Sequence, residues 1–341
     1  MLSLFDIAPH QLMHWMLISA GALFVSLLID YFFGEPPTAL HPVVWMGKYL
    51  QWMGACCAPR SNDALKKSAR ALPFIGGALA WCLAVTALLI VSLWAQRCLM
   101  ELSWYWAVPL LALLLKPCWS WRMLADEVAA VEAALQVSLA AGRARLAWLV
   151  SRNVQNLDET TVRESAIETL AENLNDSVIA PLFWFVVAGL PGAVVYRFAN
   201  TADAMWGYRG ERGGRVWTWA GKWAARADDV LSWPTARLTA ILMYLVCASL
   251  ERGHFFVALR REAVKTDSPN SGWPMASMAL LLNVRLAKPD VYVLHPEGDA
   301  AQSKHVRAAL EVAGSVVLLW NGLLLCALII VLMLKFDFSH V

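Results

Sequence analysis

The sequence predicts an all-α, polytopic integral membrane protein with helical cytoplasmic segments and re-entrant or broken helices. Charged residues make up only 16% of the 341-residue chain, well below the quarter that is typical of soluble domains, and the mean hydropathy is +0.52. Apolar residues are gathered in blocks of about 20, the length that crosses a bilayer core of roughly 30 Å. These blocks predict membrane spans near residues 13–33, 71–95, 102–120 and 312–335.

The distribution of basic residues predicts the orientation of the spans. Five Lys or Arg residues lie in the connection 34–70, whereas the short link after Ala95 carries only Arg97. Because cytoplasmic connections are enriched in positive charge, we expect 34–70 and 121–311 to lie on the cytoplasmic face of the cell (inner) membrane. The net charge of +2 gives no indication of a nucleic-acid partner.

Three helices are expected after the third span, lying on the cytoplasmic face. The first, 121–141, is amphipathic and is expected to end at Gly142, since glycine is a common helix C-cap. The second covers 143–153, and the third begins near Asp158 or Thr160, either of which can cap it.

Two further apolar runs, 178–199 and 238–250, are hard to read as simple spans. The first contains Pro181 and the break at 190–192, and six Lys or Arg residues follow it in the segment 200–237. A re-entrant or broken hairpin, with its irregular backbone buried in protein, would keep those charges in the cytoplasm. We expect the runs to dip into the membrane, and the whole chain, 1–341, to form one integrated domain.

Polar side chains cluster at the mouths of the apolar segments. Asp30, Glu35 and His41 surround a turn rich in Gly and Pro. A carboxylate at the end of a span is energetically costly unless it has a partner, so the cluster indicates a functional site. The alternative is a loop whose polar groups merely face water.

A second cluster is a stripe of carboxylates at i, i+4 spacing from Glu164 to Asp176. Like charges at this spacing repel one another on a helix. The outer acids, Glu164 and Glu168, can simply be solvated. Glu172 and Asp176, with Asn173 between them, enter an apolar segment and need a cation there, either an Arg or a hard metal such as Mg²⁺.

Further polar groups follow along the chain. Asn200 and Asp203 can share a helical face. Of the adjacent Asp228 and Asp229, one can bind a metal ion while the other pairs with an arginine; the alternative is a structural salt bridge alone. The other members are Arg226, Arg237 and the turn Ser268-Pro-Asn270-Ser-Gly-Trp-Pro274, whose amides can form an anion nest. The residues alone indicate a membrane enzyme or a transporter with an intracellular acidic site, suited to magnesium and a phosphorylated substrate.

The order of these motifs resembles the CobD/CbiB family of cobalamin biosynthesis, adenosylcobinamide-phosphate synthase. The resemblance runs in one order from about residue 22 to 292. It is carried by Asp30/Gly34/His41-Pro-Val, Ser151-Arg-Asn153, Glu168-Thr-Leu-Ala-Glu-Asn173…Asp176, Asn200-Thr-Ala-Asp203-Ala-Met205, Ala225-Arg-Ala-Asp-Asp229 and Ser268-Pro-Asn-Ser-Gly-Trp-Pro274.

The resemblance implies an amide ligation that depends on ATP and Mg²⁺. A propionate carboxylate of the corrinoid adenosylcobyric acid would be joined to aminopropanol or its O-phosphate, giving adenosylcobinamide or its phosphate. Other membrane enzymes of cobalamin synthesis are possible partners.

The resemblance also assigns roles to residues. The catalytic centre would comprise Glu172, Asp176, Asp203, Asp228 and His41, where His41 or one of the acids takes the amine proton. The metal would be held by Glu172, Asp176, Asp228 and Asp229, and substrate by Asn173, Asn200, Arg226, Arg237, Ser268 and Asn270.

Several positions depart from the family pattern. Asn153 and Thr266 stand where Asp and His are expected, Glu262 replaces an Asp, and Met275 replaces an acid. A segment poor in glycine follows, which limits how closely its backbone can approach a ligand. These departures leave open a non-catalytic scaffold or corrinoid-binding component. A transporter is a third hypothesis, for which Asp30 would be the intramembrane acid.

Overall fold

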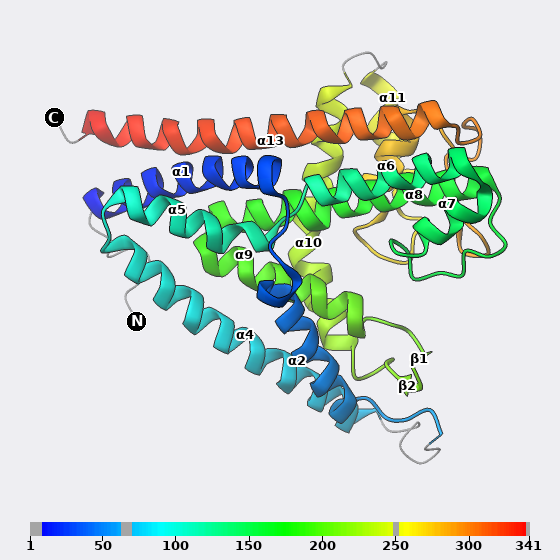
Figure 1. Ribbon diagram of the computed structural model, residues 1–341, viewed down its shortest axis with the longest axis horizontal. Helices are drawn as coiled ribbons and strands as arrows, with labels where there is room; N and C mark the ends of the chain where they lie inside the picture. Colours follow the sequence, from blue (N-terminus) through cyan, green and yellow to red (C-terminus); the bar gives the residue numbers. More distant parts are fainter. Residues whose placement is uncertain (1–8, 63–69, 248–251, 339–341) are drawn as a thin grey trace. The chain divides into compact units, whose positions relative to one another are not determined.

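The computed structural model describes residues 9–62, 70–247 and 252–338, and the chain is folded almost entirely into helices (Figure 1). The helices are α1 (Pro9–Phe33), α2 (Pro42–Cys57), α4 (Ala71–Met100), α5 (Trp104–Leu115), α6 (Arg122–Val137), α7 (Leu139–Leu146), α8 (Glu159–Leu174), α9 (Ala180–Trp206), α10 (Lys222–Val246), α11 (Arg252–Ala263), α12 (Gly272–Leu281) and α13 (Ser303–Phe338). Short 3₁₀ turns lie at Thr38–Leu40 and Lys116–Cys118, and a π-helical turn lies at Asn175–Ile179. Two antiparallel hairpins complete the fold: β1 (Glu211–Arg212) with β2 (Arg215–Val216), and β3 (Leu286–Lys288) with β4 (Tyr292–Leu294).

The protein is an all-α polytopic membrane protein. Among the described residues, four helical segments are long and apolar enough to cross a bilayer: Met13–Phe33, Ala71–Met100, Glu159–Trp206 and Ser303–Ile330. Helix α4 shows the physical reason most clearly, because it carries no charge before Arg97 and leaves many large apolar side chains exposed. An apolar surface of this extent is stable in lipid and unfavourable in water.

The segment expected to span at 102–120 contains a shorter helix. Helix α5 has only 12 residues, about 18 Å at 1.5 Å per residue, and therefore does not reach across the bilayer core by itself. It lies alongside α1 (Figure 1).

The apolar run 178–199 belongs to a helical segment that continues from α8 through the π-turn into α9. The expected break is present as a kink at Gly189, which has φ 68° and ψ −159°. The amide of the next residue, Leu190, donates to Oε1 of Gln96 on α4 over 3.1 Å. A side chain thus satisfies a backbone donor at the kink, as burial in an apolar layer requires. The second run, 238–250, lies mostly in α10. That both runs dip into the membrane without crossing it stays a prediction.

The amphipathic helix expected over 121–141 is instead two helices. Helix α6 ends at Val137 because Ser138 is extended and caps α7, its Oγ accepting from the Ala141 amide over 3.1 Å. The expected C-cap, Gly142, is a buried residue inside α7, where a Cβ atom would collide with Leu135 of α6. The helix expected over 143–153 ends at Leu146.

The chain folds as two compact units. Unit 1 comprises Met1–Trp119, Pro181–Leu231 and Asn321–Val341, and unit 2 comprises Ser120–Ala180 and Ser232–Trp320. Large side chains from α2, α4 and α9, including Leu50, Trp81, Phe198 and Trp206, form the core of unit 1. In unit 2, α8 is packed against α6, α7, α12 and β3. The expectation of one integrated domain stays a prediction.

Candidate functional site

The acidic helix α8 lies at the centre of unit 2. It begins where the sequence predicts, because Oδ1 of Asp158 accepts hydrogen bonds from the amide and hydroxyl of Thr161 at 2.8 and 2.7 Å. From this cap the carboxylates follow at i, i+4 spacing, and Glu164, Glu168 and Glu172 are met by groups from other segments of the unit.

The outer acids of the stripe are buried, so the alternative that they are simply solvated is wrong. Glu164 and Glu168 are each only 1% exposed. Arg285 approaches Glu164 to 3.2 Å, and the amide of Ala287 donates to the same carboxylate over 3.2 Å. Glu168 pairs with Arg152 at 2.7 Å. Buried carboxylates need such compensation, and here two arginines from outside α8 supply it.

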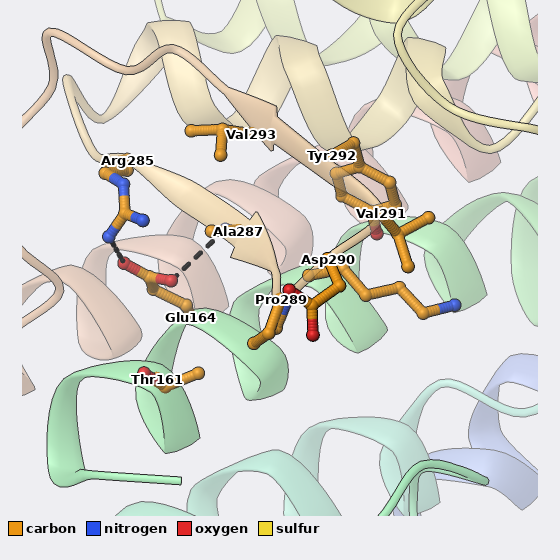
Figure 2. A pocket seen from close by; sticks show the side chains of 10 residues that line it. Thr161, Glu164, Arg285, Ala287, Pro289, Asp290, Val291, Tyr292 and Val293 are labelled. Atoms are coloured by element: carbon orange, nitrogen blue, oxygen red, sulfur yellow. Dashed lines mark hydrogen bonds and ion pairs between the residues drawn. The ribbon is translucent and has the colours of Figure 1, made fainter.

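The β3–β4 hairpin and α8 enclose a pocket of about 430 Å³ (Figure 2). Glu164 lies in the pocket wall with its carboxylate held by Arg285 and Ala287, and Tyr292 and Asp290 come from the hairpin. The hairpin turn is closed by the amide of Val291, which donates to the Lys288 carbonyl over 3.0 Å. The pocket is thus lined by one acid of the stripe and by mixed charges from a rigid turn.

A second charged group lies farther along α8, around Glu168 and Glu172. Arg152 and Lys288 are the cations whose charges act on the Glu172 carboxylate. The pKa of Tyr292 is raised, first by burial and then by the negative charges of Glu168 and Glu172. We call these five residues the α8 cluster. It brings two carboxylates, two cations and a neutral phenol together.

Two buried atoms of the α8 cluster retain hydrogen-bonding capacity. Oε1 of Glu168 and Nη1 of Arg152 have no hydrogen-bond partner of ordinary length among the described residues. An unsatisfied buried polar atom costs roughly 1–3 kcal/mol. The pair therefore indicates a site that is completed by water, an ion or a ligand.

The inner end of the stripe coincides with the π-turn. Asp176 accepts a hydrogen bond from Nδ2 of Asn175 over 2.7 Å, and Oδ1 of Asn175 accepts one from the Thr239 hydroxyl over 3.2 Å. Nδ2 of Asn173 donates to the Thr169 carbonyl over 3.0 Å. π-turns recur at functional sites because they shift side chains out of the regular helical register, and this one begins within the Glu172–Asp176 motif.

The Ser268–Pro274 turn does not form the expected anion nest. The amides of Asn270 and Ser271 donate to Oγ of Ser268 over 3.2 and 3.3 Å. Arg237 donates to the Asn270 side chain and the Pro269 carbonyl over 2.7 and 3.0 Å. Its guanidinium also lies 4.6 and 4.7 Å from the ring centroids of two tryptophans, Trp233 and Trp273. In this arrangement Arg237 stabilises the turn.

The first polar cluster lies in unit 1 and is a buried network of charges. Nζ of Lys116 contacts Asp30 at 3.1 Å and Glu35 at 2.6 Å, so the alternative of a loop merely facing water does not hold. Nε2 of His41 lies 3.1 Å from Glu35, and its Nδ1 accepts from the Val43 amide over 3.2 Å. The proton of His41 therefore lies on Nε2, and both ring nitrogens are engaged.

The remaining predicted residues of unit 1 lie on α9 and α10. Arg226 pairs with Asp229 at 3.2 Å, the contact that a structural salt bridge predicts. The predicted site residues are thus divided: unit 1 holds His41, Asn200, Asp203, Arg226, Asp228 and Asp229, and unit 2 holds Glu172, Asn173, Asp176, Arg237, Ser268 and Asn270. That they meet in one pocket stays a prediction. Within 9–62, 70–247 and 252–338, no three His, Cys, Asp or Glu side chains are grouped so as to hold a metal ion.

Sequence reasoning missed the residues that surround α8. The hairpin escaped notice although Lys288-Pro-Asp290 is a turn signal followed by the strand-favouring residues Val291-Tyr292-Val293. No pattern in the sequence could pair Glu164 with Arg285, because 121 positions separate them.

Comparison with known proteins identifies relatives over nearly the whole chain. The sequence model of the family described as CobD/Cbib protein matches residues 23–316. A protein of Stutzerimonas stutzeri named cobalamin biosynthesis protein CobD is 38% identical over 308 residues, covering 88% of this chain and 95% of the relative. One of Methanothermobacter thermautotrophicus, named probable cobalamin biosynthesis protein CobD, is 35% identical over 305 residues with the same coverage. No solved structure matches the chain.

Proposed function

Because the chain belongs to the CobD/CbiB family, and its relatives support a role in cobalamin biosynthesis, we propose that it joins aminopropanol or its O-phosphate to a propionate carboxylate of adenosylcobyric acid. The reaction consumes ATP, depends on Mg²⁺ and yields adenosylcobinamide or its phosphate. The protein is then a carbon–nitrogen ligase.

The α8 cluster is the observation that carries this proposal. Its buried pair, Glu168 and Arg152, lies beside Glu172, Lys288 and Tyr292. Oε1 of Glu168 and Nη1 of Arg152 lack a hydrogen bond of ordinary length among the described residues, and water or a ligand can supply one. Cations and carboxylates placed together in a partly dry environment are suited to binding a phosphorylated anion and to moving protons.

The chemistry balances in two steps. A corrin carboxylate attacks the γ-phosphorus of ATP, the bond from that phosphorus to the bridging oxygen breaks, and ADP leaves. The amine nitrogen then attacks the acyl carbon, the carbon–nitrogen bond forms, and the carbon–oxygen bond to phosphate breaks. Inorganic phosphate leaves with the electron pair, and the ammonium nitrogen gives its proton to a base.

Two acids at the inner end of the stripe are the first proposed ligands of the magnesium ion. Glu172 on α8 and Asp176 in the π-turn supply carboxylate oxygens, and Mg²⁺ is commonly bound by one or two carboxylates together with substrate phosphates and water. When bound, the ion neutralises charge on the phosphates. Asp228 and Asp229 on α10 are the other proposed ligands, with Asp203 of α9 as a further acid of the centre.

The proton from the amine is best assigned to a carboxylate. His41 was the other candidate, but its Nδ1 accepts from Val43 and its Nε2 donates to Glu35. For His41 to take a proton, one of these contacts has to break. A carboxylate of α8 needs no such rearrangement.

An assay on purified protein in detergent tests the proposal. Adenosylcobyric acid, aminopropanol phosphate, ATP and Mg²⁺ should yield adenosylcobinamide phosphate, detected by mass spectrometry, with one ADP released per product. Glu172→Gln and Asp228→Asn should each lower kcat at least about 100-fold, a usual effect of losing a catalytic acid or base.

Glu159→Gln is the matched control for the variants of the ligase centre. It changes the same residue type on the same helix, but its side chain is 57% exposed. Normal product formation by Glu172→Gln and Asp228→Asn would refute the residue assignment. Absence of product from the well-folded wild-type protein would refute the ligase.

The non-catalytic alternative predicts corrinoid binding without ADP release in the same assay. The departures from the family pattern that suggested it have structural roles here. The Thr266 hydroxyl donates to the Ser268 carbonyl over 3.0 Å, and the Met275 sulfur accepts from the Tyr292 hydroxyl over 3.7 Å. Oδ1 of Asn153 accepts from the Gln155 amide over 2.9 Å. These roles are compatible with an active ligase.

The proposed ligase works on the cytoplasmic face of the inner membrane, where ATP is available. Labelling of single cysteines in the segment 200–237 with an impermeant maleimide should require permeabilised cells. Labelling of intact cells would place this segment, and the acids beside it, on the opposite face.

A further inference from the structure

A second pocket, in unit 1, is lined by two arginines, and none of its lining residues is proposed for the ligase. It has a volume of about 570 Å³ and is enclosed by the end of α2, the segment 58–60 that follows it, the first turns of α4 and β2. Its walls are mostly apolar, and the charges in them belong to Arg60 and Arg215. The size lies within the range of small-molecule sites, roughly 300–1,000 Å³.

The two arginines are directly opposite one another. Arg60 and Arg215 form an antiparallel β-bridge. Two hydrogen bonds of 2.9 Å extend this bridge: the Ser61 amide donates to the Gly214 carbonyl, and the Val216 amide donates to the Pro59 carbonyl. Side chains directly opposite in such a pair lie about 5 Å apart at Cβ, and like charges at these positions are destabilising.

No protein group offsets this repulsion in the part of the chain that the structure describes. Neither arginine forms an ion pair with a carboxylate there, and the recorded hydrogen bond of the Arg215 side chain runs from Nη1 to the Ala58 carbonyl over 2.7 Å. A guanidinium has five N–H donors, so Arg215 is anchored and retains donors for a ligand. An anion between the two side chains would turn the repulsion into attraction.

The pocket continues into an exposed apolar face of a membrane-spanning helix. Helix α4 begins at Ala71 beside the pocket, and Leu72, Ile75, Leu79 and Leu83 follow at spacings of three and four residues. Each of these side chains is more than half exposed. Such spacing places them along one side of the helix. A polar, cationic site and an apolar stripe therefore lie end to end.

The wall of the pocket is held rigidly. Gly77 of α4 touches the Ala220 backbone so closely that a Cβ atom would collide with its carbonyl oxygen. On α2, Gly54 likewise lies against Trp217, which follows β2. These contacts hold Trp217 and Ala220, which follow β2, against both helices, so the backbone that carries Arg215 is positioned before any ligand arrives.

We propose that this pocket binds an anionic phospholipid. The phosphate lies between Arg60 and Arg215, and an acyl chain follows the α4 stripe of Leu72, Ile75, Leu79 and Leu83. The amphiphilic character of the site favours a lipid over free phosphate, because only a lipid covers both the charged and the apolar part. The bound lipid holds the hairpin at the membrane surface.

Lipid-dependent thermal unfolding of the purified full-length protein tests this proposal. Phosphatidylglycerol should raise the unfolding temperature in a saturable way, whereas phosphatidylcholine with the same acyl chains and inorganic phosphate should not. Native mass spectrometry should show a retained anionic lipid. In Arg60→Gln the concentration for half-maximal stabilisation should rise at least tenfold, and Arg60→Gln/Arg215→Gln should lose the effect.

Arg212→Gln is the matched control for the lipid site, since it removes the same charge from the same hairpin outside the pocket. The Arg212 guanidinium lies 3.8 Å from the centroid of the Tyr208 ring, and its removal should leave the lipid response unchanged. Arg60→Gln retains the backbone bridge, so a folding defect does not account for its weaker response. Equal stabilisation by both lipids, a full response to phosphate alone, or an unchanged response of Arg60→Gln would each overturn the proposal.

Discussion

Lys116 offers the sharpest test of how unit 1 is stabilised. Its side chain is only 2% exposed, and Nζ is surrounded by Asp30, Glu35 and the Trp119 carbonyl at 3.1, 2.6 and 3.1 Å. Lys116→Met keeps a long unbranched side chain and removes the charge. Two acids, Asp30 and Glu35, then face one another without the cation.

The distances set the expected magnitude. At an effective dielectric constant of about 20, contacts of 2.6 and 3.1 Å correspond to roughly 6 and 5 kcal/mol of attraction. Desolvation of three buried charges offsets most of this sum, so the network as a whole contributes little. Removing one partner is different, because the desolvated acids remain. Loss of one member of a buried pair costs about 3–5 kcal/mol.

The assay is thermal unfolding in detergent, followed by intrinsic tryptophan fluorescence. At roughly 2 °C per kcal/mol for a chain of this size, Lys116→Met should lower the unfolding temperature by about 6–10 °C. Neutralising the acids as well, in Lys116→Met/Asp30→Asn/Glu35→Gln, should restore most of the loss, because no uncompensated charge remains. The single variants Asp30→Asn and Glu35→Gln complete the cycle.

Either of two results would refute the electrostatic account of the network. If the triple variant is as unstable as Lys116→Met, the loss comes from packing or from the Trp119 contact, and the unpaired acids are not its cause. An unfolding temperature of Lys116→Met equal to that of the wild type would show that water compensates the acids and that the site is not dry.

Two further predictions concern unit 2. Hydrogen bonds from Thr161 lower the pKa of Asp158 below its ordinary value, so its cap stabilises the protein above about pH 3.8 and loses this effect as the pH falls through the lowered pKa. Asp158→Ala should therefore cost about 0.5–2 kcal/mol at neutral pH, measured by chemical denaturation, and the difference should shrink in acid. Asp158→Asn should remain near wild type at neutral pH, and a deficit as large as that of alanine would contradict the capping role. Gly142→Val should cost about 1–3 kcal/mol because the added atoms collide with Leu135, whereas the exposed control Ala144→Val should cost much less; equal costs would indicate a propensity effect alone.

The membrane class, the main apolar helices and the family could all be predicted from the sequence. A hydrophobic block such as 71–95 is more stable in lipid than in water, and this preference does not depend on the rest of the fold. The start of α8 was equally accessible, because an N-cap such as Asp158 acts on an amide only three residues away. The order of the motifs along the sequence was enough to identify the family, and no distance between them in the folded protein was needed.

Predictions failed where the outcome depended on a neighbour. The stripe of α8 is acidic along its length, and nothing local distinguishes a solvated glutamate from the buried Glu164 and Glu168. Their burial depends on Arg285 and Arg152, which the fold brings to them from beyond each end of the helix. The interruption at Ser138 is similar, since a serine inside an amphipathic pattern ends a helix only where its hydroxyl is used as a cap.

The sequence by itself determined that this is a membrane protein and identified long apolar segments such as 71–95, because transfer of apolar side chains from water is a property of the segment alone. Only the tertiary structure decided which charges are paired. The free energy of a buried charge depends on the few ångströms to its nearest partner, as in the 2.6 Å contact between Lys116 and Glu35. Those distances exist only once segments from remote parts of the chain have packed together.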